Sequence, residues 1–323
     1  MSRIHDALKK ADFEGPPVPP PVSRKPVSTR VEPAEAAEDS IPDVAISSRP
    51  QASQAVLVEE ADLDDLELVI QNATVVPYAP QADALLVDPI NPRAAPAEEF
   101  RTLRTRLNHL QTLQPLHTLV VTSASPAEGK SFTATNLAIT QSQLADKRIL
   151  LADFDFRRPN INKTFQLDCA PGLTDYLLGN ASLEDILRRI GGTNLYVLTA
   201  GEAVPNPLEL LNLKECRSLI DNLRNHFDWV VLDSPPLLFA ADANLLATMC
   251  DGTILVVRIG STTYDSVTRG LQSLCENNVL GMVVNGARRG ELYSKYTYYH
   301  DYYYDREKSG ETADSKLALG DGE

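Results

Sequence analysis

One short loop constrains the fold of this 323-residue chain more than any other feature. An apolar run at 118–122 leads into Ala124-Ser-Pro-Ala-Glu-Gly-Lys-Ser131, where a helical pattern begins. The spacing fits a phosphate-binding loop with Ala124 in place of the first glycine, in which backbone amides at a helix N-terminus surround phosphate oxygens. In such a loop Lys130 reaches the β and γ phosphates and the Ser131 hydroxyl can bind Mg²⁺. The sequence therefore predicts a strand, a phosphate-binding loop and a helix in succession.

Apolar runs alternate with amphipathic helical patterns from 98 to 289. The predicted strands cover 118–122, 148–153, 195–199, 229–233, 253–258 and 281–285, and the predicted helices include 131–144, 207–225 and 266–277. This alternation predicts an α/β fold with a mainly parallel, twisted sheet and helices on both faces. Ligands bind such sheets at the carboxyl ends of the strands.

The first 95 residues differ in composition from the rest. Fourteen of the 22 prolines lie within 1–96, with an acidic block at 59–67 and little apolar periodicity. Such a segment cannot bury enough apolar surface to offset the entropy of ordering. We therefore expect three parts, which are a disordered arm at 1–95, a folded domain at 96–289 and a tyrosine-rich tail at 290–323. Short helices at 2–11 and 63–70 are the expected exceptions within the arm.

Charge and cysteine spacing exclude several classes of protein. A net charge of −14 at pH 7 disfavours nucleic acid as a partner. The sequence has no run of 18 apolar residues and no hydrophobic signal-peptide core near its N-terminus, so we expect a cytoplasmic protein. The four cysteines are widely spaced and have no histidine at metal-ligand spacing, which favours reduced structural thiols.

Carboxylates follow two of the predicted strands. One strand ends in Asp153-Phe-Asp155 and another ends in Asp233. A carboxylate at the tip of a buried strand is costly without a cation or donors beside it, and Mg²⁺ bound to phosphates supplies such a cation. Helix capping is the structural alternative, but three such residues beside a phosphate-binding loop favour a metal–nucleotide site.

Seven of the eleven tyrosines lie close together beyond the last predicted strand. They are Tyr293, Tyr296, Tyr298, Tyr299, Tyr302, Tyr303 and Tyr304. Buried tyrosines follow a period of 2 or 3.6, whereas this run is nearly contiguous, so we expect exposed phenols. Taken alone, the cluster fits stacking platforms, self-association or phosphate acceptors.

Residues 85–304 resemble the bacterial tyrosine kinases of polysaccharide export, the BY-kinases. The three nucleotide-binding motifs of that family match 124–131, 149–157 and 230–236, and a terminal tyrosine cluster is a hallmark of the family. The segment 96–104 resembles the family's Glu-x-x-Arg-x-x-Arg sequence, through which subunits form a ring. The departures are Ala127, where many members have glycine, and Phe132, where threonine is common.

The resemblance implies a role for each candidate residue, with ATP and Mg²⁺ as cofactors. The residues around the phosphates would be Ala127, Glu128, Gly129, Lys130, Ser131 and Phe132. Ser131, Asp155 and Asp233 would hold Mg²⁺. Asp153 would accept the proton of an incoming tyrosine hydroxyl, since a carboxylate can assist a phenol with a pKa near ~10.

Two assignments stay open at this point. Arg157 either stabilises the transferring charge or forms a salt bridge to the acidic cluster. Asn285, at the end of the last predicted strand, either contacts the adenine edge or is a simple turn residue.

The resemblance also implies partners. The acceptor would be the tyrosine tail of a neighbouring subunit in a homo-oligomeric ring. Glu98, Arg101 and Arg104 share one helix face and are the candidate interface, with an exposed ion pair inside that helix as the alternative. A membrane-embedded chain-length protein would activate the kinase and recruit it to the inner face of the membrane, and a tyrosine phosphatase would act on it.

Two other functions compete with this interpretation. A switch ATPase of the partition and septum-positioning class shares the fold and the paired aspartates, but it has no use for the tyrosine cluster. Its phosphate loop usually carries a second lysine at the position that Ser125 holds here. A non-catalytic assembly scaffold would use the tyrosines for self-association alone.

Overall fold

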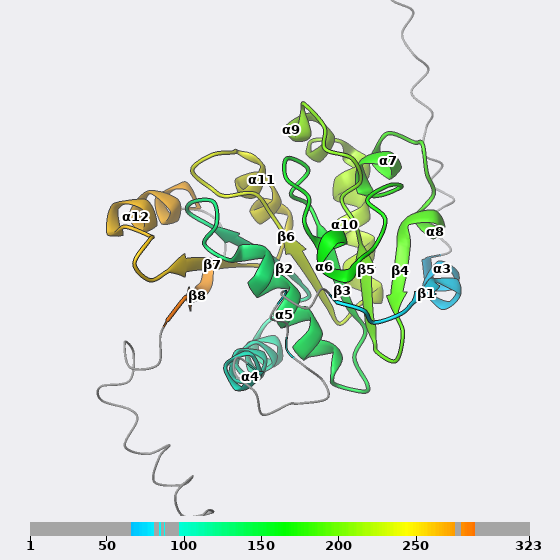
Figure 1. Ribbon diagram of the computed structural model, residues 1–323, viewed down its shortest axis with the longest axis horizontal. Helices are drawn as coiled ribbons and strands as arrows, with labels where there is room; N and C mark the ends of the chain where they lie inside the picture. Colours follow the sequence, from blue (N-terminus) through cyan, green and yellow to red (C-terminus); the bar gives the residue numbers. More distant parts are fainter. Residues whose placement is uncertain (1–65, 81–83, 85–86, 88–96, 275–278, 288–323) are drawn as a thin grey trace, which may run out of the picture. The chain divides into compact units, whose positions relative to one another are not determined.

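The computed structural model describes residues 66–80, 84, 87, 97–274 and 279–287, and an eight-stranded sheet organises them (Figure 1). The strand order is β1-β4-β5-β3-β6-β2-β7-β8. The strands are β1 (Thr74–Val76), β2 (Thr118–Ser123), β3 (Ile149–Asp153), β4 (Leu187–Ile190), β5 (Leu195–Leu198), β6 (Trp229–Asp233), β7 (Gly252–Arg258) and β8 (Val279–Asn285). All neighbouring pairs in this sheet are parallel except β4 with β5, as the alternating sequence pattern predicts.

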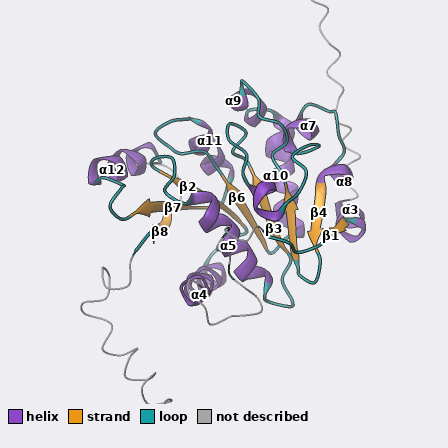
Figure 2. Ribbon diagram, in the orientation of Figure 1, coloured by secondary structure: helices purple, strands orange, loops and turns teal. Residues whose placement is uncertain are grey.

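Helices cover both faces of the sheet (Figure 2). They are α3 (Leu66–Asn72), α4 (Ala97–Leu113), α5 (Lys130–Ser142), α6 (Ile161–Phe165), α7 (Leu173–Leu177), α8 (Leu183–Ile186), α9 (Pro207–Leu211), α10 (Lys214–His226), α11 (Asp242–Met249) and α12 (Tyr264–Ser273). None of these described helices is long and apolar enough to span a lipid bilayer.

Successive side chains of β2 point to opposite faces of the sheet and so contribute to two separate hydrophobic cores. Leu119 and Val121 pack in one core with α4 and α5, whereas Val120 lies in the other core with α10 and α11. All six residues of β2 are buried, which explains why this strand is a continuous apolar run rather than an alternating one. The predicted α/β fold with helices on both faces is therefore confirmed.

The C-terminal end of the predicted arm is folded and packs with the domain. Residues of α3 and β1 lie in the segment 1–95, yet Leu66 and Ile70 are buried in the core beside α10. The Arg148 guanidinium holds Glu67 through two bonds of 2.7 and 3.0 Å. The domain boundary predicted at 96 is therefore wrong for 66–76, whereas the short helix expected at 63–70 corresponds to α3. Residues 1–65 and the tail 290–323 lie outside the described residues.

Most predicted elements agree with the structure within two residues at each end, and β6 agrees at both ends. The predicted helix at 207–225 is instead two helices, because Leu213 has an extended backbone with φ −60° and ψ 144°. The sequence analysis also missed β1 and β4. Each has only three or four residues, too few to show a period.

Candidate functional site

The loop between β2 and α5 has the backbone that an anion site requires. Ala127 and Gly129 both adopt the left-handed conformation, with φ of 62° and 97°. A Cβ at Gly129 would displace the Asn285 amide nitrogen and would strain the backbone at this positive φ, so glycine is favoured there. Ala127 adopts the same left-handed backbone conformation although its Cβ disfavours it, at a cost of roughly 1–2 kcal/mol. The departure from glycine at 127 therefore affects the backbone, although it leaves the phosphate-facing groups unchanged.

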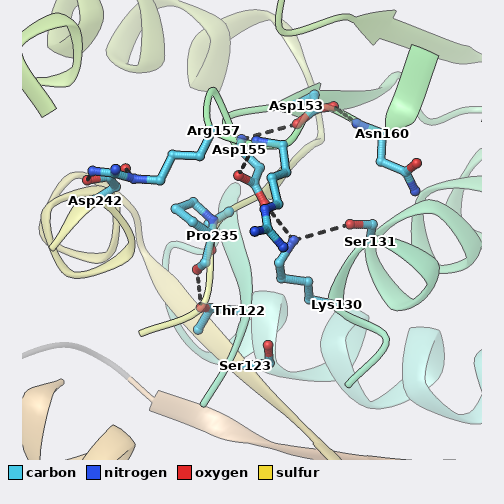
Figure 3. Close-up of polar contacts among 12 residues, drawn as sticks. Thr122, Ser123, Lys130, Ser131, Asp153, Asp155, Arg157, Asn160, Pro235 and Asp242 are labelled. Carbon is cyan, nitrogen blue, oxygen red and sulfur yellow. Dashed lines mark hydrogen bonds and ion pairs between the residues drawn. The ribbon is translucent and has the colours of Figure 1, made fainter. Parts of the chain in front are cut away.

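Lys130 begins α5 and points to the ends of the neighbouring strands (Figure 3). Its ammonium group lies 2.7 Å from the Asp155 carboxylate and 3.4 Å from the Ser131 hydroxyl. Burial alone lowers the pKa of Lys130, but the negative charges of Asp233 and Asp155 outweigh it, so the pKa lies above its ordinary value. The side chain is therefore a partly buried cation that a phosphate can compete for.

Asp233 ends β6 in the same cluster. The residue is fully buried, and neither carboxylate oxygen has a hydrogen-bond partner among the described residues. Burial raises the pKa of Asp233, while the charge of Lys130 and the nearby Ser131 hydroxyl lower it. Two buried carboxylate oxygens that form no close hydrogen bond are chemically suited to a hard cation such as Mg²⁺.

Asp153 occupies the matching position on β3, and its carboxylate is held by three backbone amides (Figure 3). One oxygen accepts from Asn160 and Ile161 at 3.0 Å each, and the other accepts from Asp155 at 3.1 Å. Burial and the charge of Asp233 raise the pKa of Asp153 despite these donors. These contacts at the start of α6 match the helix-capping alternative, and the role of proton acceptor stays a prediction.

Arg157 extends away from Lys130 and pairs with Asp242 on α11 (Figure 3). Its two guanidinium nitrogens lie 2.8 and 3.1 Å from the two carboxylate oxygens. The predicted salt bridge therefore exists, but its partner is not the acidic cluster of 153, 155 and 233. Bonding to Asp242 raises the pKa of Arg157 and engages one edge of its guanidinium group.

Asn285 lies against the phosphate-binding loop. Its amide nitrogen donates to the Glu128 carbonyl at 3.0 Å, and its amide oxygen accepts from the Gly286 backbone at 2.8 Å. The bond from Gly286 agrees with the turn-residue alternative, the bond to Glu128 joins Asn285 to the loop, and the adenine contact stays a prediction.

Two further residues touch the loop and were missed by the sequence analysis. Arg258 donates to the Ala127 carbonyl at 3.1 Å, and the Thr262 hydroxyl donates to the Glu128 carboxylate at 2.5 Å. Both lie more than 130 positions from their partners, and no local pattern marks them.

The predicted interface residues on α4 make contacts within the domain. Arg101 pairs with Glu98 at 3.1 Å, as the intrahelical alternative predicts, while Arg104 donates to the Thr140 carbonyl on α5 at 2.7 Å. Phe132 packs edge-on against Phe100, with ring centroids 6.0 Å apart. The aromatic departure from the family thus joins the helix after the loop to α4.

Known proteins resemble this chain across the domain that carries the site. A family model described as an AAA domain matches residues 120–278. The chain is 36% identical over 210 residues to tyrosine-protein kinase YwqD of Bacillus subtilis. This match covers 64% of this chain and 88% of YwqD. It is 32% identical over 198 residues to tyrosine-protein kinase Etk of Escherichia coli, covering 61% of this chain and 27% of Etk.

Solved structures agree with the sequence matches. The kinase domain of the Escherichia coli tyrosine kinase ETK superposes with a TM-score of 0.60 at 30% identity, covering 65% of this chain and 84% of that domain. The chimerical protein CapA2B2 superposes with a TM-score of 0.59 at 27% identity, covering 68% of this chain and 97% of the chimera.

Proposed function

This chain belongs to the family of bacterial tyrosine-protein kinases, and from that premise we propose that it is an ATP-dependent tyrosine autokinase that regulates polymerisation and export of an exopolysaccharide or capsule. One observation carries the proposal. The partly buried Lys130 meets the buried carboxylates of Asp155 and Asp233 at the carboxyl ends of parallel strands, directly behind a phosphate-binding loop. A parallel sheet binds its ligands at this edge.

The loop and Lys130 would bind the phosphates of ATP. The amides at the start of α5 are donors for phosphate oxygens, and the Lys130 ammonium would exchange Asp155 for the β and γ phosphates. Ser131, Asp155 and Asp233 would hold Mg²⁺, and the two unpaired oxygens of Asp233 support this donor set. When bound, Mg²⁺ neutralises charge on the phosphates.

Asp153 would accept the proton of the attacking tyrosine hydroxyl. Its raised pKa supports this assignment, because a base works best when its pKa is near the working pH. The three amide donors fix the orientation of the carboxylate and leave further lone pairs on its oxygens. Arg157 has no part in this scheme, since Asp242 engages it.

The acceptors would be the seven tail tyrosines of a neighbouring subunit. From Gly290 to Tyr302 the chain reaches at most ~40 Å, enough to cross a subunit boundary. Glu98, Arg101 and Arg104 would contribute to that boundary in a ring. The Glu98 side chain is 66% exposed, so its carboxylate is accessible to a second subunit.

The family resemblance supports the remaining parts of the proposal. A membrane-embedded chain-length protein would activate this kinase and recruit it from the cytoplasm to the inner face of the membrane. A tyrosine phosphatase would reset the tail.

A partition-type switch ATPase is the second candidate function, and one contact disfavours it. That class usually carries a second lysine near the start of the loop, where this chain has Ser125. Here the Ser125 amide donates to the Glu128 carboxylate at 2.9 Å, which closes the loop without a second lysine.

Incubation with ATP and Mg²⁺ followed by mass spectrometry of the tail tests the proposal. We expect phosphotyrosine within 293–304, and at least ~100-fold less in Lys130→Met because one charged donor to the reacting phosphate is lost. Lys214→Met is the matched control, since that lysine is 81% exposed on α10. Release of ADP and phosphate with an unmodified tail would favour the switch ATPase, and neither reaction would favour a scaffold.

A further inference from the structure

Two consecutive carbonyls of the phosphate-binding loop bond to side chains from the last residues of β7 and β8. Arg258 donates to the Ala127 carbonyl and Asn285 donates to the Glu128 carbonyl, at 3.1 and 3.0 Å. These peptide bonds are trans. In a trans peptide the C=O and the following N–H point in opposite directions. The amides of Glu128 and Gly129 therefore point to the side of the loop opposite Arg258 and Asn285.

A third contact holds the loop through the Glu128 side chain. A buried carboxylate is unexpected in a loop that binds anions, yet this residue is 1% exposed. One oxygen accepts from the Ser125 amide at 2.9 Å, and the other accepts from the Thr262 hydroxyl at 2.5 Å. The Thr262 hydroxyl in turn accepts from the Arg258 amide at 2.7 Å. The carboxylate thus ties the start of the loop to the segment between β7 and α12.

The backbone explains why the loop needs these contacts. Ala127 is left-handed without being glycine, a conformation that an isolated loop does not favour. The Arg258 bond to its carbonyl fixes that conformation from outside. Gly129 lacks room for a side chain because Asn285 approaches so closely, so the position of Asn285 depends on glycine at 129.

We propose that Asn285, Arg258 and Thr262 are positioning residues that hold the loop amides in the orientation that binds the phosphates of the nucleotide. The ligand class is a di- or triphosphate, and the three side chains act through the loop. The inference rests on the proposed function only in taking ATP as the ligand. It also replaces the adenine contact expected for Asn285 with a role that is independent of the base.

The two roles of Asn285 differ in a measurable way. A residue that positions the loop affects every polyphosphate alike, whether or not a base is attached. A residue that contacts adenine affects ATP, leaves inorganic tripolyphosphate unchanged and sets the preference for ATP over GTP.

The test measures displacement of a fluorescent ATP analogue from the full chain by ATP, GTP and inorganic tripolyphosphate with Mg²⁺. For Asn285→Ala we expect all three dissociation constants to rise by the same factor of about 3 to 10, which corresponds to the loss of one hydrogen bond. The ratio of ATP to GTP affinity stays at the wild-type value. Asn222→Ala is the matched control, because that amide also donates to a backbone carbonyl but lies on α10.

Thr262 supplies a second pair of variants. Thr262→Val removes the hydroxyl at nearly constant volume, and we expect the same uniform weakening, whereas Thr262→Ser keeps the bond and stays near wild type. Thermal unfolding of each variant shows whether the fold persists. Should Asn285→Ala fail to fold, the Thr262 pair still tests whether contacts from outside the loop set its affinity for polyphosphates.

Several outcomes would overturn the inference. Unchanged tripolyphosphate binding with weaker ATP binding, or a lost preference for ATP, would assign Asn285 to the base. Unchanged binding of all three ligands in Asn285→Ala and Thr262→Val would remove the positioning role. Absence of tripolyphosphate binding in the wild type would overturn it as well. Failure to form phosphotyrosine, with uniform weakening intact, would instead remove the kinase proposal alone.

Discussion

Asp153 and Asp233 are register partners where β3 and β6 end, and both carboxyl groups are buried. Burial raises the pKa of each group, and the charge of Asp233 raises the pKa of Asp153 further. The pair is therefore unfavourable when both groups are ionised and no phosphate or cation is bound. This conflict has consequences for stability and for catalysis.

The first prediction concerns pH. A carboxyl group with a raised native pKa binds more protons in the native state than in the unfolded state. Its contribution to stability is complete below the unfolded-state pKa of about 3.9 and is lost as pH rises through the native pKa. We expect the free energy of unfolding, measured with urea in EDTA without nucleotide, to fall from pH 5 to pH 8 by less in Asp153→Asn than in the wild type.

Asp265→Asn is the control for that experiment, because this carboxylate is 74% exposed on α12. It should follow the wild-type dependence on pH. Equal slopes for Asp153→Asn and the wild type would show that the buried pair does not couple folding to protons.

The second prediction separates the three aspartates by function. Asp155→Asn and Asp233→Asn should weaken Mg²⁺-dependent ATP binding, because each removes a charged oxygen ligand. Asp153→Asn should lose transfer to tyrosine more than it loses ATP affinity, since its amide can still accept from the Asn160 and Ile161 backbone. Calorimetric titration with and without Mg²⁺, beside phosphotyrosine yield, measures both. Equal loss of nucleotide affinity in all three variants would remove Asp153 as the base.

The third prediction concerns Arg157 and Asp242. Removing Arg157 leaves a carboxylate that is 1% exposed without its cation, while the guanidinium itself is 43% exposed and partly screened. We expect Arg157→Ala to lower the free energy of unfolding by about 1–3 kcal/mol. The double variant with Asp242→Ala should be less destabilised than the sum of the single variants.

Arg269→Ala is the matched control for the third prediction. Arg269 pairs with Asp265 on the surface of α12, and its loss should cost less than about 1 kcal/mol. If phosphoryl transfer fell in Arg157→Ala but not in Asp242→Asn, at a temperature where both are folded, Arg157 would regain a direct role in catalysis.

The fourth prediction concerns assembly. Each phosphate adds about −1.5 to −2 charges, so modification of all seven tail tyrosines adds roughly −10 to −14 per subunit to a chain already at −14. Subunits should associate when the tail is unmodified and separate when it is phosphorylated, and added salt should reduce the difference. Light scattering of phosphorylated protein, beside a variant with all seven tyrosines changed to phenylalanine, measures this. Identical oligomer sizes at low salt would show that the charge of the tail does not control assembly.

The sequence by itself determined the features that depend on short-range patterns. The run from β2 through Ser131 into α5 follows from an apolar strand, a loop of defined spacing and a helical period, all within about 25 residues. Asp153, Asp155 and Asp233 were predicted at strand ends for the same reason. Parallel pairing then brings those ends together, because the alternation of strands and helices leaves few other topologies.

Only the tertiary structure decided the contacts between distant segments. The Arg157 bond to Asp242 spans 85 positions, and the Asn285 bond to Glu128 spans 157. The short strand β1 joins the sheet through β4, and α3 docks through Leu66 and Ile70. Three residues of β1 are too few to show a period. A short helix is expected at 63–70, but its docking onto the domain, like the partner of a side chain across the sheet, depends on where distant segments lie. Their structure is decided by packing and hydrogen bonding in the folded state, which no local pattern records.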